Sequence, residues 1–139
     1  MKITIINLQK KLLIRPSKIK KLVLHILKNE KIKKSGWINI CFVNNRLIKK
    51  FNAKFHRTNG PTDVLAFNLN GPDKPKVLLA DIMVSTDMAI DAADRFDTTA
   101  GYELSLYVAH GILHILGYND RTKTQLKLMR KKEGQYVNQ

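Results

Sequence analysis

The chain has 139 residues, of which 44% are hydrophobic and 26% are charged, and its formal net charge is +14 at pH 7. This length suits one folded domain, residues 1–139, and the composition excludes a disordered chain. The single cysteine, Cys41, excludes a disulfide framework. No run of about 18 apolar residues occurs, so we expect no membrane span and a cytoplasmic protein.

The charge is distributed unevenly along the chain. The net charge is +15 over residues 1–60, −6 over residues 61–120 and +5 over residues 121–139. Basic segments on both sides of an acidic centre indicate a surface that binds a polyanion, arranged around carboxylates that could hold a cation. The alternative is a solvated lysine-rich surface with no nucleic-acid partner.

The first half of the chain alternates strands and helices. The β-branched run over residues 2–7 predicts a strand. Pro16 opens an amphipathic helix over residues 16–31, and its core face is predicted to consist of Ile19, Leu22, Leu24, Ile26 and Leu27. A largely apolar strand follows over residues 36–43, and then a helix over residues 44–56, capped by Asn44 or Asn45.

Turn signals at residues 58–61 and 70–75 enclose a strand over residues 62–69, which is predicted to be an edge strand or the antiparallel neighbour of the next. The apolar run over residues 76–85 predicts a buried central strand. A short helix capped by Thr86 follows over residues 86–96.

Residues 100–116 are apolar nearly all round, which is typical of a buried helix, and Gly117 provides its stop. A basic helix over residues 122–137 closes the chain. The order β-α-β-α-β-β-α-α-α predicts an α+β fold, with one mixed four-stranded sheet covered by about five helices.

The stretch HGILHILGYND, residues 110–120, combines candidate metal ligands. His110 and His114 lie four residues apart, so a helix presents both imidazoles on one face. If Gly117 ends the helix there, the chain can turn and bring Asp120 back to the same point. Two imidazoles and one carboxylate leave a fourth position for water, as in a catalytic zinc site.

Two other interpretations bear on this helix. His110 and His114 could instead be core histidines bonded to the backbone or to Tyr118. Glu103 lies two turns before His110 on the same side, about 10 Å away along the axis, and we expect it to have a structural role. Gly111 stands where a zinc peptidase of the H-E-x-x-H type has its general base, which disfavours proteolysis.

Three ordered blocks resemble the YbeY family. HGILHILGYND resembles its H-G-x-L-H-x-x-G-Y-D-H motif, NAKFHRTNGPTDVLAFNL its N-x-x-Y-R-x-x-x-x-P-T-D-V-L-S-F block, and LADIMVS its G-D-I-x-I-S strand. Asp120 replaces the third histidine of the motif, and Asn119 replaces its aspartate. Ala66 and Ala80 replace a serine and a glycine.

The resemblance implies a metal-dependent, single-strand-specific endoribonuclease that acts in ribosomal RNA maturation, at the 16S 3′ end, and in ribosome quality control. It implies metal ligation by His110, His114 and Asp120. It also implies that His114 and Arg57 are catalytic, with Arg57 facing the substrate phosphate. A guanidinium can bind a phosphodiester through two parallel N–H···O hydrogen bonds. Asp63 is expected to have a structural role.

The implied cofactor is one divalent metal ion, Zn²⁺, although a carboxylate in place of an imidazole makes the site friendlier to Mn²⁺. The implied partners are ribosomal RNA precursors and the small ribosomal subunit, with no membrane. The attacking group could be a metal-bound water or the RNA 2′-hydroxyl. The alternatives are a non-catalytic RNA-binding ribosome-assembly factor with a structural metal and, third, a metallopeptidase.

Overall fold

We describe residues 1–56, 62–70 and 76–137 of a computed structural model. Their secondary structure confirms the predicted order of elements. The elements are β1 (Lys2–Asn7), α1 (Pro16–Asn29), β2 (Ser35–Val43), α2 (Asn45–His56), β3 (Val64–Asn68), β4 (Val77–Ser85), α3 (Thr86–Phe96), α4 (Ala100–Ile115) and α5 (Lys123–Val137).

The four strands form one mixed sheet in the order β1-β2-β4-β3. β1 pairs with β2 and β2 with β4 in parallel, whereas β3 is antiparallel to β4. The predictions of a central strand over residues 76–85 and of an antiparallel edge strand before it are therefore confirmed. Within the described residues, β4 has hydrogen-bonded neighbours on its two sides, whereas β3 pairs with β4 alone.

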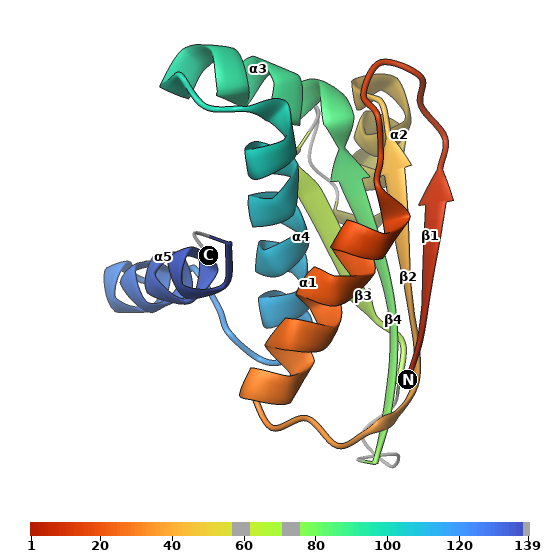
Figure 1. The fold of residues 1–139 in the computed structure, drawn as a ribbon, viewed down its shortest axis with the longest axis vertical. Coiled ribbons are helices and arrows are strands. Elements are labelled where there is room, and N and C mark those ends of the chain that lie inside the picture. The colour runs from red at the N-terminus through yellow and green to blue at the C-terminus, as the bar shows by residue number, and fades with distance from the viewer. Residues whose placement is uncertain (57–61, 71–75, 138–139) are drawn as a thin grey trace.

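The helices lie in layers on the sheet. α1 and α4 cover one face, and α5 lies outside them, farther from the sheet (Figure 1). α2 packs against the other face, where Ile48 meets Val43, Leu65 and Met83 in a small cluster of buried residues. Of the helices in the described part of the chain, none is long and apolar enough to cross a membrane.

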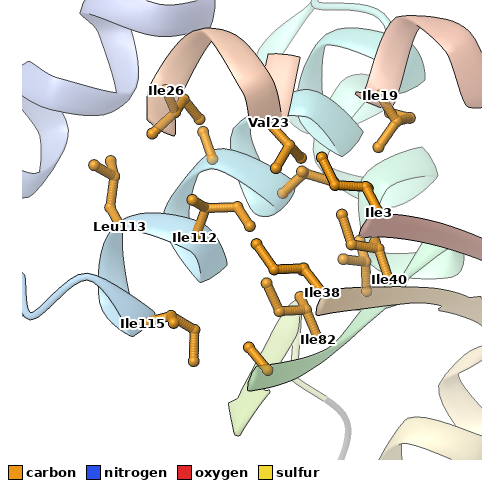
Figure 2. Packing of buried hydrophobic residues seen from close by; sticks show 14 of the residues in the cluster. Ile3, Ile19, Val23, Ile26, Ile38, Ile40, Ile82, Ile112, Leu113 and Ile115 are labelled. Atoms are coloured by element: carbon orange, nitrogen blue, oxygen red, sulfur yellow. The ribbon is translucent and has the colours of Figure 1, made fainter. Parts of the chain in front are cut away.

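The main core lies between the sheet and the α1–α4 layer, as Figure 2 shows. Alternate residues of β2 point into it: Ile38, Ile40 and Phe42 are all 0% exposed. Ile112 of α4 meets them from the other side and is also 0% exposed. Each such burial contributes about 1.5–3 kcal/mol, so this layer holds α4 firmly against the sheet.

Some of the sequence predictions were wrong in detail. Leu24 was predicted to face the core but is 50% exposed, whereas Val23 is buried. A stripe at residues 19, 23, 26 and 27 follows the helical period more closely, and Leu24 falls beyond its edge. The turn predicted at residues 58–61 and most of the turn at 70–75 lie outside the described residues.

The predicted helix caps fared differently. For α2, the prediction named Asn44 or Asn45, and the cap is Asn44. Its Oδ1 accepts a hydrogen bond from the backbone N–H of Leu47 at 2.9 Å. Thr86 was predicted to cap α3, but Ser85 does so by accepting from Met88 N–H at 3.1 Å. Thr86 is the first helical residue, and its hydroxyl donates to the carbonyl of Val43.

Candidate metal centre

The C-terminal end of α4 turns the chain back on itself. The backbone N–H of Gly117 donates to the carbonyl of His114 at 3.1 Å, and that of Tyr118 donates to the carbonyl of Leu113 at 3.0 Å. These two bonds form a Schellman motif, which needs a left-handed residue at its turn, and Gly117 provides it with φ +107°. The helix therefore stops where the sequence predicted, and the following chain returns toward its last turns.

His110 is held between two carboxylates. Its Nδ1 lies 2.7 Å from Oε2 of Glu133 on α5, and its Nε2 lies 3.3 Å from Oδ2 of Asp120. The Glu133 side chain is only 4% exposed, and it also accepts from the Arg130 guanidinium at 2.9 Å. The chain after Gly117 therefore brings Asp120 back beside His110.

His114 is oriented by the turn that follows it. Its Nδ1 lies 3.0 Å from the carbonyl oxygen of Tyr118. A carbonyl can only accept, so Nδ1 carries the proton and Nε2 carries the lone pair. The rings of His110 and His114 are nearly parallel, 15° apart in plane and 6.2 Å between centres.

These contacts bear on both interpretations of the histidine pair. The bond from His114 to the Tyr118 carbonyl is of the kind that the core-histidine alternative predicted, but His114 is exposed and is no core residue. His110 is bonded through Nδ1 to the Glu133 carboxylate, which that alternative did not include. This same arrangement is also the usual support of metal-binding histidines, because it fixes the tautomer and leaves Nε2 as the donor atom.

The carboxylates near His110 favour positive charge at this point. Burial lowers the pKa of His110, but the hydrogen bond to Glu133 and the charges of Glu133, Asp63 and Asp120 raise it more, so the net shift is upward. A cation bound at Nε2 would meet the same attraction as the proton. The electrostatics of the pocket thus suit a positively charged ligand.

The donors suit a divalent metal in kind, although they do not surround one point. Two imidazoles and a carboxylate are a donor set that Zn²⁺ accepts. Over residues 1–56, 62–70 and 76–137, however, no three His, Cys, Asp or Glu side chains are arranged so as to hold a metal ion. His110 and Asp120 instead contact each other directly.

A hollow of about 420 Å³ opens beside these residues and is lined by His110, His114, Asp120, Asp63 of the segment before β3, and Asn52 of α2. Asp63 was expected to have a structural role, yet its charge raises the pKa of His110. The hollow thus lies at the β3 edge of the sheet, between α4 and α2.

Gly111 explains why no general base follows His110. A Cβ at this position would lie 3.0 Å from Ile82 Cγ2 and 3.1 Å from Val64 Cγ2. Position 111 therefore lies close against the sheet, and a glutamate there would require these side chains to shift by a few tenths of an ångström. The close packing disfavours the H-E-x-x-H arrangement on this helix.

Glu30 fastens α5 to the rest of the molecule. It accepts hydrogen bonds from Tyr118 Oη at 2.5 Å, from Lys132 Nζ at 3.0 Å and from Tyr136 Oη. Burial raises the pKa of the Glu30 carboxyl, but the hydrogen bonds from these three donors lower it by more. The pKa of Glu30 therefore lies below its ordinary value. One carboxylate thereby joins the end of α1, the α4–α5 connection and α5, which carries Glu133.

Sequence reasoning missed Glu133, and Arg57 lies outside the described residues. One signal for Glu133 was available, because it is the single acidic residue among six basic ones over residues 121–139. In the structure its partners are His110 and Arg130.

Comparison with known proteins identifies relatives along nearly the whole chain. The sequence profile described as "Endoribonuclease YbeY" matches residues 4–139. The protein of that name from Syntrophus aciditrophicus is 33% identical over 138 residues, covering 96% of this chain and 86% of the relative. That from Syntrophomonas wolfei is 31% identical over 117 residues, covering 78% and 75%.

A solved structure is also similar. The solution structure of a protein from Thermotoga maritima superposes with a TM-score of 0.62 at 29% sequence identity. The match covers 98% of this chain and 87% of that protein. The similarity therefore extends over nearly the whole of both chains.

Proposed function

Since this chain belongs to the endoribonuclease YbeY family, we propose that it cleaves single-stranded RNA at the site formed by His110, His114 and Asp120, with one divalent metal ion bound there. The observation that carries the proposal is the pair of imidazoles oriented through Nδ1, with Asp120 3.3 Å from His110 Nε2. We further propose ribosomal RNA precursors as substrate, at the small ribosomal subunit in the cytoplasm.

The protein's own residues have distinct roles in this proposal. Glu133 accepts from His110 Nδ1 and so keeps Nε2 turned toward Asp120. The carbonyl of Tyr118 does the same for His114. A bound metal, expected to be Zn²⁺, would polarise a phosphoryl oxygen or lower the pKa of a water. Arg57 is proposed to bind the substrate phosphate.

RNA would be held largely through its phosphates. The basic residues of α2, Arg46, Lys49, Lys50 and Lys54, are all exposed, and the same helix contributes Asn52 to the lining of the hollow beside the histidines. Such contacts release counterions, so affinity for single-stranded RNA should fall steeply between 50 and 200 mM salt, by roughly 10²-fold or more if several phosphates are contacted.

The test combines metal content with cleavage. We expect one metal per chain by elemental analysis and metal-dependent cleavage of a single-stranded RNA, both lost in His114→Ala and Asp120→Ala. Asn119→Ala, which changes an exposed neighbour in the same turn, should keep both. The cleaved ends identify the nucleophile, since attack by the 2′-hydroxyl leaves a 2′,3′-cyclic phosphate and attack by water does not.

One result would favour a non-catalytic ribosome-assembly factor instead. Wild-type protein that binds RNA but cleaves none with Zn²⁺, Mn²⁺ or Mg²⁺, together with an unchanged His114→Ala variant, would contradict the proposal. A peptidase remains disfavoured on structural grounds, because Gly111 packs against Ile82 and Val64.

A further inference from the structure

A strongly basic hollow lies where α1 ends. It has a volume of about 860 Å³, and its charged lining consists of Lys28, Lys31, Lys33 and Lys34, with no acidic group among the described residues that line it. We call it the lysine hollow. All four lysines are exposed, and none of them forms an ion pair within the described part of the chain. Like charges so close together repel one another, so they favour a bound polyanion and do not stabilise the fold.

Lys31 has a backbone conformation that residues with a side chain rarely adopt. Its φ is +58°, in the left-handed region. The backbone N–H of Lys31 donates to the carbonyl of Lys28 at 3.1 Å, and that of Ile32 donates to the carbonyl of Leu27 at 2.9 Å, so Lys31 stands at the glycine position of a Schellman motif. The turn that ends α4 has Gly117 at this position. A lysine in its place strains the backbone, which favours a function for its side chain.

The lysine hollow lies beside the turn that follows the candidate metal ligands of α4. α1 and α4 end at the same end of the molecule (Figure 1). A smaller hollow of about 240 Å³, with Gly117 and Tyr118 in its lining, shares Ile32 with the lysine hollow. Tyr118 also connects the two places, because its carbonyl oxygen lies 3.0 Å from His114 Nδ1 and its hydroxyl donates to Glu30 at 2.5 Å. A strand that leaves His114 therefore reaches the lysines by passing over Tyr118.

We propose that the lysine hollow binds backbone phosphates of the RNA strand whose cleaved bond lies at the candidate metal centre. The inference rests on the proposed function, which provides RNA as the partner. Each nucleotide carries one negative phosphodiester, so several lysines in one hollow can contact successive phosphates of one strand. Glu30, the acidic residue within this segment, does not cancel their charge, because it is paired with Lys132 of α5 at 3.0 Å. The RNA-binding surface thus extends from the metal centre to the end of α1.

The test measures the binding of a fluorescent single-stranded RNA of about 15 nucleotides to metal-free protein, by anisotropy over a range of salt concentrations. On single strands, each neutralised phosphate contributes about 0.7 to the slope of log affinity against log salt. Lys33→Gln/Lys34→Gln removes two charges, so it should lower this slope by about 1.4 and weaken binding about 25-fold at about 0.1 M salt. Lys18→Gln/Lys20→Gln removes the same charge from exposed positions near the start of α1 and should change neither quantity.

Lys31→Gly separates RNA binding from folding. Glycine adopts the left-handed conformation without strain, so the midpoint of thermal unfolding should not fall, whereas RNA affinity should fall about 5-fold at about 0.1 M salt. A lysine with no role in binding would leave the affinity unchanged, and that result would overturn the inference. An equal loss of affinity in the two double variants would also overturn it, because it would show an effect of net charge alone. So would lysine-dependent binding to phosphatidylglycerol vesicles with unchanged RNA affinity, which would assign the hollow to a membrane surface.

The outcomes for the lysine hollow and for the proposed function are separable. Wild-type protein that cleaves RNA, together with lysine variants that bind RNA as tightly as wild type does, would refute the lysine hollow and leave the endoribonuclease in place. Weaker RNA binding in Lys31→Gly and Lys33→Gln/Lys34→Gln alone, without cleavage by wild-type protein in Zn²⁺, Mn²⁺ or Mg²⁺, would support the lysine hollow and refute the cleavage proposal.

Discussion

The two sides of α4 are held by different kinds of interaction. Toward the sheet, Ile112 and Val108 pack among wholly buried aliphatic residues. Toward α5, apolar contacts through Met129 and Tyr136 are joined by polar ones, of which the Glu133 carboxylate on His110 is the contact to α4 itself. Apolar packing is not directional, so it can place a helix without orienting its polar side chains, whereas a hydrogen bond sets the direction of each group. We infer that the core determines the fold. The carboxylate contacts of α5, from Glu133 to His110 and from Tyr136 to Glu30, form a polar layer that determines the geometry of the site.

The largest expected effect separates stability from site geometry. Ile40→Ala removes a fully buried side chain from β2 and should lower the free energy of unfolding by about 2–5 kcal/mol, measured by urea denaturation. Metal binding by the protein that remains folded should be unchanged. Leu13→Ala, at a position 77% exposed, is the control and should change stability by less than about 0.5 kcal/mol. A loss of metal binding in folded Ile40→Ala would contradict the inference that the core and the site geometry depend on different contacts.

The converse change lies in the polar layer. Glu133→Gln keeps the side-chain volume but removes the charge that orients His110, and it should weaken metal affinity and RNA cleavage by about 10- to 100-fold. Metal titration and initial cleavage rates measure this, and thermal unfolding checks that the fold persists. Asp91→Asn removes the same charge at an exposed position on α3 and should have little effect. Unchanged metal affinity in Glu133→Gln would contradict the orienting role.

Glu30 gives the polar layer a pH dependence. Because its folded pKa lies below the ordinary 4.5, its contribution to stability is fully present above that value and is lost as pH falls through the folded pKa. Glu30→Gln should therefore cost about 1–3 kcal/mol of unfolding free energy at pH 7 and progressively less in acid. Urea denaturation at pH 7, 5 and 3 measures the difference. A difference that stays constant across this range would rule out the ionised Glu30 as its source.

The smallest expected effect concerns the start of α4, the helix that contacts both the core and the polar layer. Thr99 Oγ1 accepts from the backbone N–H of Tyr102 at 3.1 Å, and Thr99→Ala should lower the free energy of unfolding by about 1 kcal/mol. Thermal unfolding measures it. Thr98→Ala, an exposed position outside the cap, is the matched control. Equal effects of the two changes would show that the cap contributes nothing specific.

Much of the fold was predictable because its signals are local. Pro16 opens α1, Asn44 caps α2, and Gly117 ends α4 at the predicted place. Errors arose where two local candidates competed. Ser85 and Thr86 are both good caps, and Val23 and Leu24 are both apolar, so the choice depended on how each helix packs.

The candidate site was predictable in part for the same reason. His110, His114 and Asp120 lie within eleven residues, so the spacing on one helix and its stop place all three along one hollow, where Asp120 contacts His110. The partners that orient them are remote. Glu133 lies 23 residues from His110, and no periodicity of the α4 sequence indicates that α5 will cross beside it.

The sequence by itself determined the order of strands and helices and the histidine pair on one helix face, because periodicity, caps and a glycine stop act over a few residues. Tertiary structure alone decided which carboxylate orients His110, how Glu30 reaches Tyr136 across 106 residues, and that Glu103 is buried in the wall of α4. These contacts depend on how separate helices pack on one another, which local patterns do not encode.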